Sequence, residues 1–195
     1  MKRMLSRLRL TPKGRLRRNV VILLLVPLVL LLANRPCFTR QEALERIQET
    51  YHFGPVDAAQ WYPEEQAYVL RYDRWYAVCP LERGRFYFWD TWEPGYWGLT
   101  AAPVEDAPLS VCGLCYSDII FGLCSDPAIE AVRLTYTDGE NTHTVETSPG
   151  EGGLFLYHCP EALLEYSRYT AQGLNGQGQV LYTVTRSVIY ENELI

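Results

Sequence analysis

The stretch from residue 67 to residue 89 reads AYVLRYDRWYAVCPLERGRFYFW, and it decides the fold of the middle of the chain. It contains three runs rich in aromatic and β-branched residues, Ala67 to Tyr72, Trp75 to Cys79 and Arg85 to Trp89, which short polar segments separate. Such runs favour β-strands, and connections of two to five residues are typical of hairpins. The stretch therefore predicts a three-stranded antiparallel meander.

A helix is expected just before this meander. Thr39 and Glu42 have the spacing of a capping box, in which the hydroxyl caps the first turn and the carboxylate reaches back. Apolar residues then recur at helical spacing: Ala43, Leu44, Ile47 and Tyr51. We predict a helix from Arg40 to Tyr51, which with the meander forms an α+β domain over residues 38–92.

Further upstream, residues 20–33 read VVILLLVPLVLLLA, an uninterrupted apolar run. At ~1.5 Å per residue it extends roughly 21 Å, which is shorter than the ~30 Å hydrocarbon core and also fits the hydrophobic region of a signal peptide. The basic leader is long, however, and no small-residue cleavage site follows the run. We therefore expect a transmembrane anchor or uncleaved signal over residues 20–34, with a cleaved signal as the alternative.

Charge divides the chain at this apolar run. The first eighteen residues hold eight of the 18 cations and no acid, so the chain from Asn34 onward carries ten cations and all 23 acids, a net charge of −13. Basic flanks stay in the cytoplasm, which predicts a cytoplasmic segment 1–19, a single-pass anchor in the cell membrane through residues 20–33 and an extracytoplasmic C-terminal part. The acidity of that part excludes a nucleic-acid partner.

Downstream of the meander, residues 93–110 are rich in Gly, Pro, Ala and acids and predict a connector. From residue 111 to residue 195, short alternating segments recur about every ten residues between Gly, Asn and Asp turns. This pattern is typical of a small all-β, immunoglobulin-like sandwich. The expected fold class is thus an N-terminal membrane helix, an α+β domain and a β-sandwich domain.

Six cysteines in an exported chain favour disulfide bonds. The first interpretation joins Cys37 to Cys79 and Cys124 to Cys159, and leaves Cys112 and Cys115 as partners. The Cys112-Gly-Leu-Cys115 spacing also occurs in thiol-disulfide oxidoreductases, which gives a redox alternative. A zinc site from Cys112, Cys115, Cys124 and either His158 or Cys159 is a further alternative, but we predict no metal and no cofactor.

All five tryptophans lie between residues 61 and 97. One interpretation is a core between the two domains, in which Trp75 and Trp89 face the helix. The other is an exposed binding face for a protein, peptide or glycan, because the aromatic residues continue into a turn-rich loop. The candidate binding residues are then Trp89, Trp92, Tyr96 and Trp97.

The sequence contains none of the motifs of nucleophilic or metal-dependent hydrolases and no phosphate-binding loop. We therefore expect a membrane-anchored exported domain that acts as a binding module and not as an enzyme. The alternatives are an exported thiol-disulfide oxidoreductase that uses Cys112 and Cys115, and a secreted factor released by signal cleavage.

Overall fold

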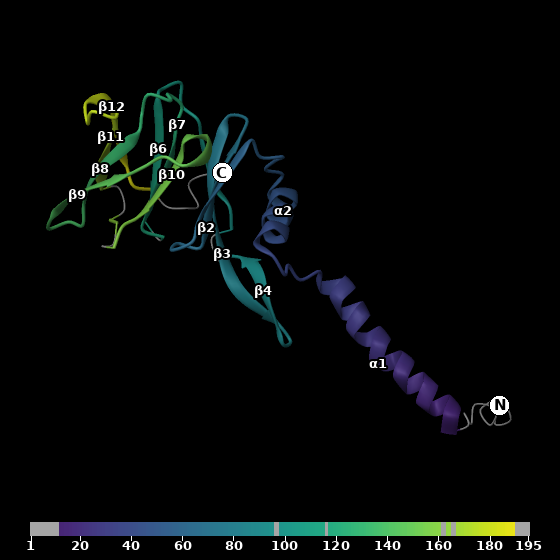
Figure 1. Ribbon diagram of the computed structural model, residues 1–195. Helices are drawn as coiled ribbons and strands as arrows, with labels where there is room; N and C mark the ends of the chain where they lie inside the picture. The colour runs from purple at the N-terminus through teal and green to yellow at the C-terminus, as the bar shows by residue number, and fades with distance from the viewer. Residues whose placement is uncertain (1–11, 96–97, 116, 161–162, 165–166, 190–195) are drawn as a thin grey trace. The chain divides into compact units, whose positions relative to one another are not determined.

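The computed structural model describes residues 12–95, 98–115, 117–160, 163–164 and 167–189. The chain forms two compact units, Met1–Cys37 and Phe38–Ile195, which we call the first and the second unit. The first unit contains helix α1, and the second unit contains helix α2 and strands β1 to β12 (Figure 1).

Helix α1 spans Pro12–Asn34, and its most apolar 18 residues have a mean hydropathy of 2.2. It is long and apolar enough to be a signal sequence or a single membrane anchor. The helix begins eight residues before the expected anchor at residues 20–34. Its first turns therefore contain four cations, Lys13, Arg15, Arg17 and Arg18. Pro27 lies inside the helix without ending it.

Helix α2 spans Arg40–Tyr51, which confirms the helix expected from the capping box. The Thr39 hydroxyl accepts a hydrogen bond from the Glu42 backbone N–H at 3.1 Å, and Glu42 accepts one from the Thr39 N–H at 3.2 Å. The apolar side of the helix, Ala43, Leu44 and Ile47, is fully buried. His52 ends the helix in the left-handed conformation.

The first sheet has the order β1-β2-β3-β4, and β5 also pairs with β3. All of its pairs are antiparallel. Its strands are β1 (Ala58–Tyr62), β2 (Ala67–Tyr72), β3 (Trp75–Phe86), β4 (Trp89–Pro94) and β5 (Thr100–Pro103). The strand expected at residues 67–72 is confirmed, and the one expected at 75–79 forms the start of the longer β3. The strand expected at 85–89 is wrong, because Phe86 pairs with Trp89 and the chain turns back between them.

Two further antiparallel sheets complete the second unit. The second sheet has the order β10-β7-β6 and the third has the order β12-β11-β8-β9. Their strands are β6 (Leu109–Leu114), β7 (Ile119–Cys124), β8 (Ala131–Thr137), β9 (Thr142–Thr147), β10 (Leu154–His158), β11 (Arg168–Leu174) and β12 (Val180–Ser187). A short 3-10 helix, η2 (Glu151–Gly153), precedes β10.

The second sheet is the middle layer of the unit, between the first and third sheets (Figure 1). Every residue of β6 and β7 is buried, because alternate side chains pack into two different cores. Phe121 faces Tyr76 of the first sheet, with ring centroids 5.4 Å apart, and Ile120 belongs to the core shared with the third sheet. The expected immunoglobulin-like sandwich is not confirmed, and the expected connector at residues 93–110 contains β5 and the start of β6.

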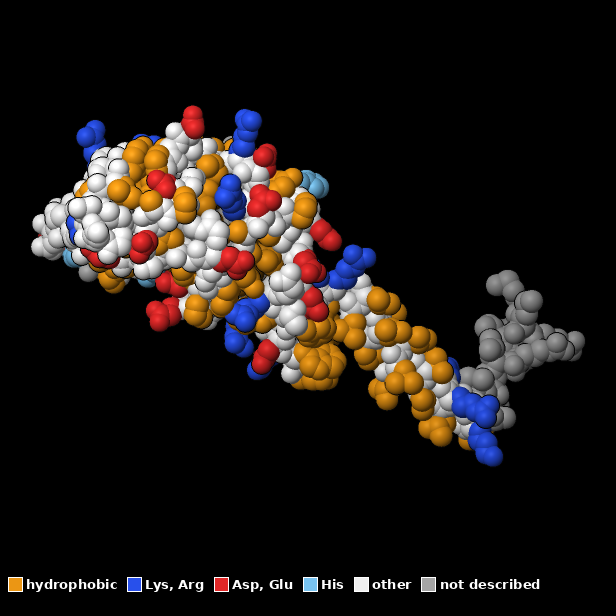
Figure 2. Space-filling view, turned by 45° about the horizontal axis from the view of Figure 1, so that its top comes forward, with side chains coloured by type: hydrophobic (Ala, Val, Ile, Leu, Met, Phe, Trp, Pro, Cys, Tyr) orange, Lys and Arg blue, Asp and Glu red, His pale blue; other side chains and the backbone are white. Residues whose placement is uncertain are grey.

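Charges lie on the outside of this stack. Figure 2 shows Asp and Glu side chains spread over the visible face of the second unit, and Lys and Arg side chains at the beginning of α1. Arg186 on β12 donates to both carboxylate oxygens of Glu105, with the Nε to Oε1 distance at 3.1 Å. This bidentate pair ties the last strand to the segment that follows β5.

Candidate functional site

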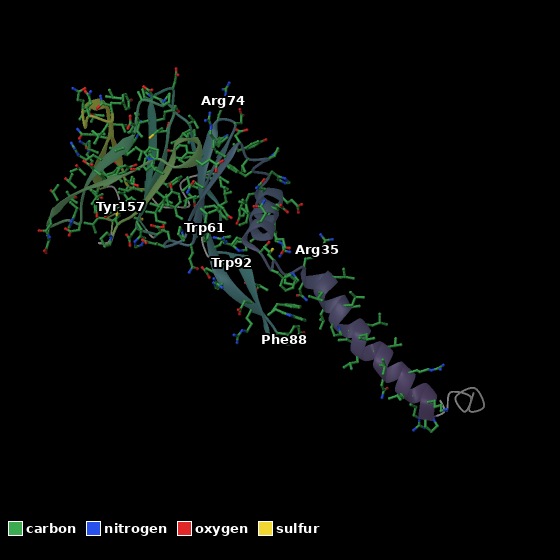
Figure 3. All side chains as sticks on the ribbon, viewed as in Figure 1. Arg35, Trp61, Arg74, Phe88, Trp92 and Tyr157 are labelled. Atoms are coloured by element: carbon green, nitrogen blue, oxygen red, sulfur yellow. The ribbon has the colours of Figure 1, made fainter. Side chains whose placement is uncertain are left out.

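A pocket of about 420 Å³ opens where the start of α2 meets β1, β3 and β4. Its lining unites two arginines, two tryptophans, a proline and a glutamine: Arg40, Trp61, Pro63, Gln66, Arg83 and Trp92. Figure 3 shows Trp61 and Trp92 close together at this place. The volume lies within the range of small-molecule pockets in proteins.

Local pairing holds these side chains in position. Trp61 on β1 lies opposite Tyr68 on β2, and their rings are 4.8 Å apart. Arg83 on β3 lies directly opposite Trp92 on β4. Arg40 is the first residue of α2, immediately after the Thr39 cap. The pocket thus combines one capped helix start with two cross-strand pairs.

The arginines lie over the indole rings. The Arg40 guanidinium carbon is 4.7 Å from the centre of the Trp61 ring and 6.0 Å from that of Trp92. The Arg83 guanidinium carbon is 4.6 Å from the centre of the Trp92 ring. The two indoles meet edge to face, with centroids 6.0 Å apart. Cation–π attraction and aromatic packing therefore fix all four side chains together.

This arrangement presents both apolar surface and positive charge to a ligand. A guanidinium that is held through its face keeps its N–H donors along its edge, where they match a carboxylate in a bidentate way. The indole rings supply flat apolar surface beside these donors. The pocket is therefore suited to a small ligand that carries a carboxylate next to an apolar face.

Comparison with known proteins gives a family. The family described as "Domain of unknown function (DUF5044)" matches residues 36–149, more than half of the chain. The chain belongs to the DUF5044 family. Every residue that lines the pocket lies inside the matched range. No curated protein matches the DUF5044 chain, and no solved structure matches it.

A larger hollow of about 860 Å³ adjoins the pocket in the DUF5044 chain, since Pro63 and Gln66 line both. Three carboxylates, Glu64, Glu65 and Glu82, line the larger hollow. Acids predominate over the whole second unit, so carboxylates here are expected on a solvated surface. The smaller pocket is the stronger candidate, because it gathers two of the few cations against two tryptophans.

The candidate binding aromatics lie in different places. Trp92 lines the pocket, whereas Trp89 lies outside it at the end of the β3–β4 hairpin and is 40% exposed. Tyr96 and Trp97 lie outside the described residues. Trp75 and Trp89 do not form a core against α2 as expected, because Trp75 is also 40% exposed and its neighbour Tyr76 takes the buried position.

Sequence reasoning missed five of the six pocket residues, Arg40, Trp61, Pro63, Gln66 and Arg83. Arg40 and Gln66 carry no local signal, because an exposed cation at a helix start and a glutamine in a turn are ordinary surface residues. The Arg83 position follows from the hairpin register, which places it opposite Trp92. A correct placement of the hairpin turn is thus the signal that identifies this pair.

Cys112 and Cys115 of the DUF5044 chain pack against different hydrophobic cores. Cys112 lies in β6 and packs into the core shared with the first sheet, whereas Cys115 packs against the core shared with the third sheet. Cys115 follows the end of β6 at Leu114, and no disulfide bond joins these two described residues. The oxidoreductase alternative stays a prediction.

The other cysteines are also distributed through the structure. The Cys159 N–H donates to the Asp118 carbonyl, while Cys124 ends β7 six residues further on, which is about 20 Å along the strand. The structure does not bring these two together. Cys79 lies in β3, and Cys37 ends the first unit. Burial raises the pKa of the Cys79 thiol and of the Cys124 thiol to about 12, so both are protonated at neutral pH.

No disulfide bond is present among the residues that the structure describes, and the expected disulfides stay a prediction. Within the same ranges, no three His, Cys, Asp or Glu side chains gather closely enough to hold a metal ion. The zinc alternative also needs Cys124 to meet either His158 or Cys159. His158 pairs with Ile119 at the start of β7, whereas Cys124 ends that strand. The best-defined site of the DUF5044 chain is therefore the arginine–tryptophan pocket.

Proposed function

We propose that this protein is an exported, membrane-anchored binding module that holds an acidic saccharide in the arginine–tryptophan pocket. The observation that carries the proposal is the pair of guanidinium groups held at 4.7 and 4.6 Å from the Trp61 and Trp92 rings. An indole face covers the apolar side of a sugar ring, and an arginine pairs with its carboxylate. The pocket volume fits a single ring.

In this proposal, α1 stays attached as the anchor. Its first turns carry the cations Lys13, Arg15, Arg17 and Arg18, which stay on the cytoplasmic side, so the second unit lies outside the membrane. A net charge of −13 beyond residue 34 keeps most ligands of like charge away from the surface. The pocket is then a local exception in which an acidic ligand finds two cations.

The test is a fluorescence titration of the full chain with three probes: glucuronate, glucose and a glutamate-containing tripeptide. We expect glucuronate to change the tryptophan emission at the lowest concentration. Arg83→Gln weakens its binding about tenfold or more, since a hydrogen bond to a charged group contributes ~1.5–3 kcal/mol. Arg85→Gln is the matched control, because Arg85 lies two residues along the same strand and is 74% exposed beside Asp90.

Equal affinities for glucuronate and glucose would contradict the acidic-saccharide proposal, and so would an equal loss of affinity in the Arg83 and Arg85 variants. Tight binding of the peptide alone would favour a peptide-binding module. Intact mass of the native protein separates the anchored form from a secreted factor, because signal cleavage predicts a new N-terminus between Asn34 and Cys37.

A further inference from the structure

The end of the β3–β4 hairpin carries a second exposed feature, distinct from the pocket. Its two-residue turn consists of Tyr87 and Phe88, which are 61% and 78% exposed, the highest values among the described large hydrophobic residues after Asn34. Phe86 and Trp89 flank the turn as a directly paired set. Figure 3 shows Phe88 at the far end of the hairpin.

These rings form one rigid cluster. Phe88 and Trp89 have centroids 4.1 Å apart, Phe86 and Tyr87 are 4.9 Å apart, and Phe86 stacks on Trp89 at 6.4 Å. Phe38, the first residue of the second unit, meets Trp89 edge to face at 6.3 Å. We call these five residues the aromatic tip. Figure 2 shows a cluster of hydrophobic side chains at the lower end of this unit.

The backbone of the tip is unusual for a hairpin turn. Tyr87 has a φ of 57°, the left-handed region that two-residue turns ordinarily fill with Gly, Asn or Asp. A bulky aromatic residue there costs about 1–2 kcal/mol relative to the right-handed conformation. Such a cost at an exposed position indicates that the aromatic side chain serves a purpose other than folding.

The short link between Asn34 and Phe38 limits the distance between the end of α1 and the aromatic tip. The apolar helix ends at Asn34 and Phe38 contacts Trp89, so four Cα steps, at most about 15 Å, separate the helix end from the tip residue Phe38. If α1 is anchored, Phe38 therefore lies within about 15 Å of the end of the membrane helix, whatever the orientation of the two units. Only Arg85 and Asp90 carry charge directly next to the paired Phe86 and Trp89, and these two form an ion pair at 3.9 Å.

We propose that the aromatic tip docks on the bilayer and inserts its rings among the lipid headgroups next to the anchor. Tryptophan and tyrosine concentrate at this interface because each has an apolar body and a polar edge, and Trp89 and Tyr87 supply them to the tip. Because the tip is uncharged, it recognises the interfacial zone of a zwitterionic bilayer. This inference rests on the proposed anchoring by α1 and is independent of the ligand in the pocket.

The experiment uses the full chain reconstituted in phosphatidylcholine vesicles that contain brominated lipid, which quenches indoles at the depth of the bilayer. Trp89 and Trp75 form a matched pair, since each is 40% exposed and they lie at opposite ends of the hairpin system. We expect Trp89→Phe to lose at least half of the lipid-quenchable emission and Trp75→Phe to retain it. Equal losses in the two variants overturn the docking.

A photoreactive benzoylphenylalanine at position 88, with position 180 on exposed β12 as control, identifies the occupant. We expect phospholipid adducts at position 88 to exceed those at position 180 about tenfold. Cross-links to a second copy of the chain at position 88 overturn the lipid proposal. If the full chain does not stay with the vesicles, anchoring and docking are overturned together, whereas a vesicle-bound full chain with equal adducts at the two positions overturns docking alone.

Discussion

Asp138 lies in the turn between β8 and β9, where several donors converge on its carboxylate. The backbone N–H of Asn141 donates to it at 2.8 Å, that of Glu140 at 2.9 Å, and His143 Nε2 lies 3.0 Å away. These contacts, with the Asn141 N–H first, hold the pKa of Asp138 well below its usual range. The charged carboxylate thus stabilises the turn.

This depressed pKa predicts a pH dependence of stability. A carboxylate with a lower pKa in the folded chain stabilises it fully above the unfolded value of about 4, and the contribution is lost as the pH falls below that value. We expect Asp138→Asn to lower Tm at pH 7 and to reduce the drop in Tm between pH 7 and pH 3. Asp90→Asn is the control, and equal drops in wild type and Asp138→Asn would contradict the prediction.

At the scale of elements, the β3–β4 hairpin gives the clearest prediction. Tyr87→Asn places a residue that tolerates the left-handed region at the same turn position, so we expect the free energy of unfolding to rise by about 1 kcal/mol. Phe88→Asn is the control, because the φ of Phe88 is not positive. Urea unfolding measures both variants, and an equal change in the two would show that the Tyr87 conformation carries no cost.

Local signals predict some elements and miss others. The helix Arg40–Tyr51 is predicted to the residue because the Thr39 and Glu42 capping pair marks its start. The hairpin turn is missed because Tyr87 and Phe88 have strand chemistry and lack the Gly or Asn that marks such turns. β6 begins at Leu109, inside the expected connector, because burial on both faces removes the alternation that identifies a strand.

The pocket lies beyond sequence prediction for a related reason. Arg40, Trp61 and Trp92 come from three elements, and only the tertiary fold brings them into contact. The density of tryptophans indicates a binding surface, and Trp92 is among its candidate residues. The partner cations carry no local pattern, so their stacking on the indoles is visible only in the folded chain.

For the whole molecule, the two units give a prediction about truncation. The second unit, Phe38–Ile195, contains both hydrophobic cores, which lie on the two faces of the middle sheet. We expect a chain that begins at Phe38 to fold without α1 and to unfold in one cooperative transition, with a Tm within a few degrees of the full chain. Circular dichroism during thermal unfolding measures this, and a non-cooperative transition would contradict it.

The three residues between Asn34 and Phe38 also limit how far the second unit can lie from the end of α1. With α1 retained in the bilayer, a linker of at most ~15 Å and a domain with a radius of gyration of roughly 15 Å confine the protein to a layer about 50 Å deep. If the proposed anchoring and ligand binding hold, the protein meets its ligand by lateral diffusion within that layer.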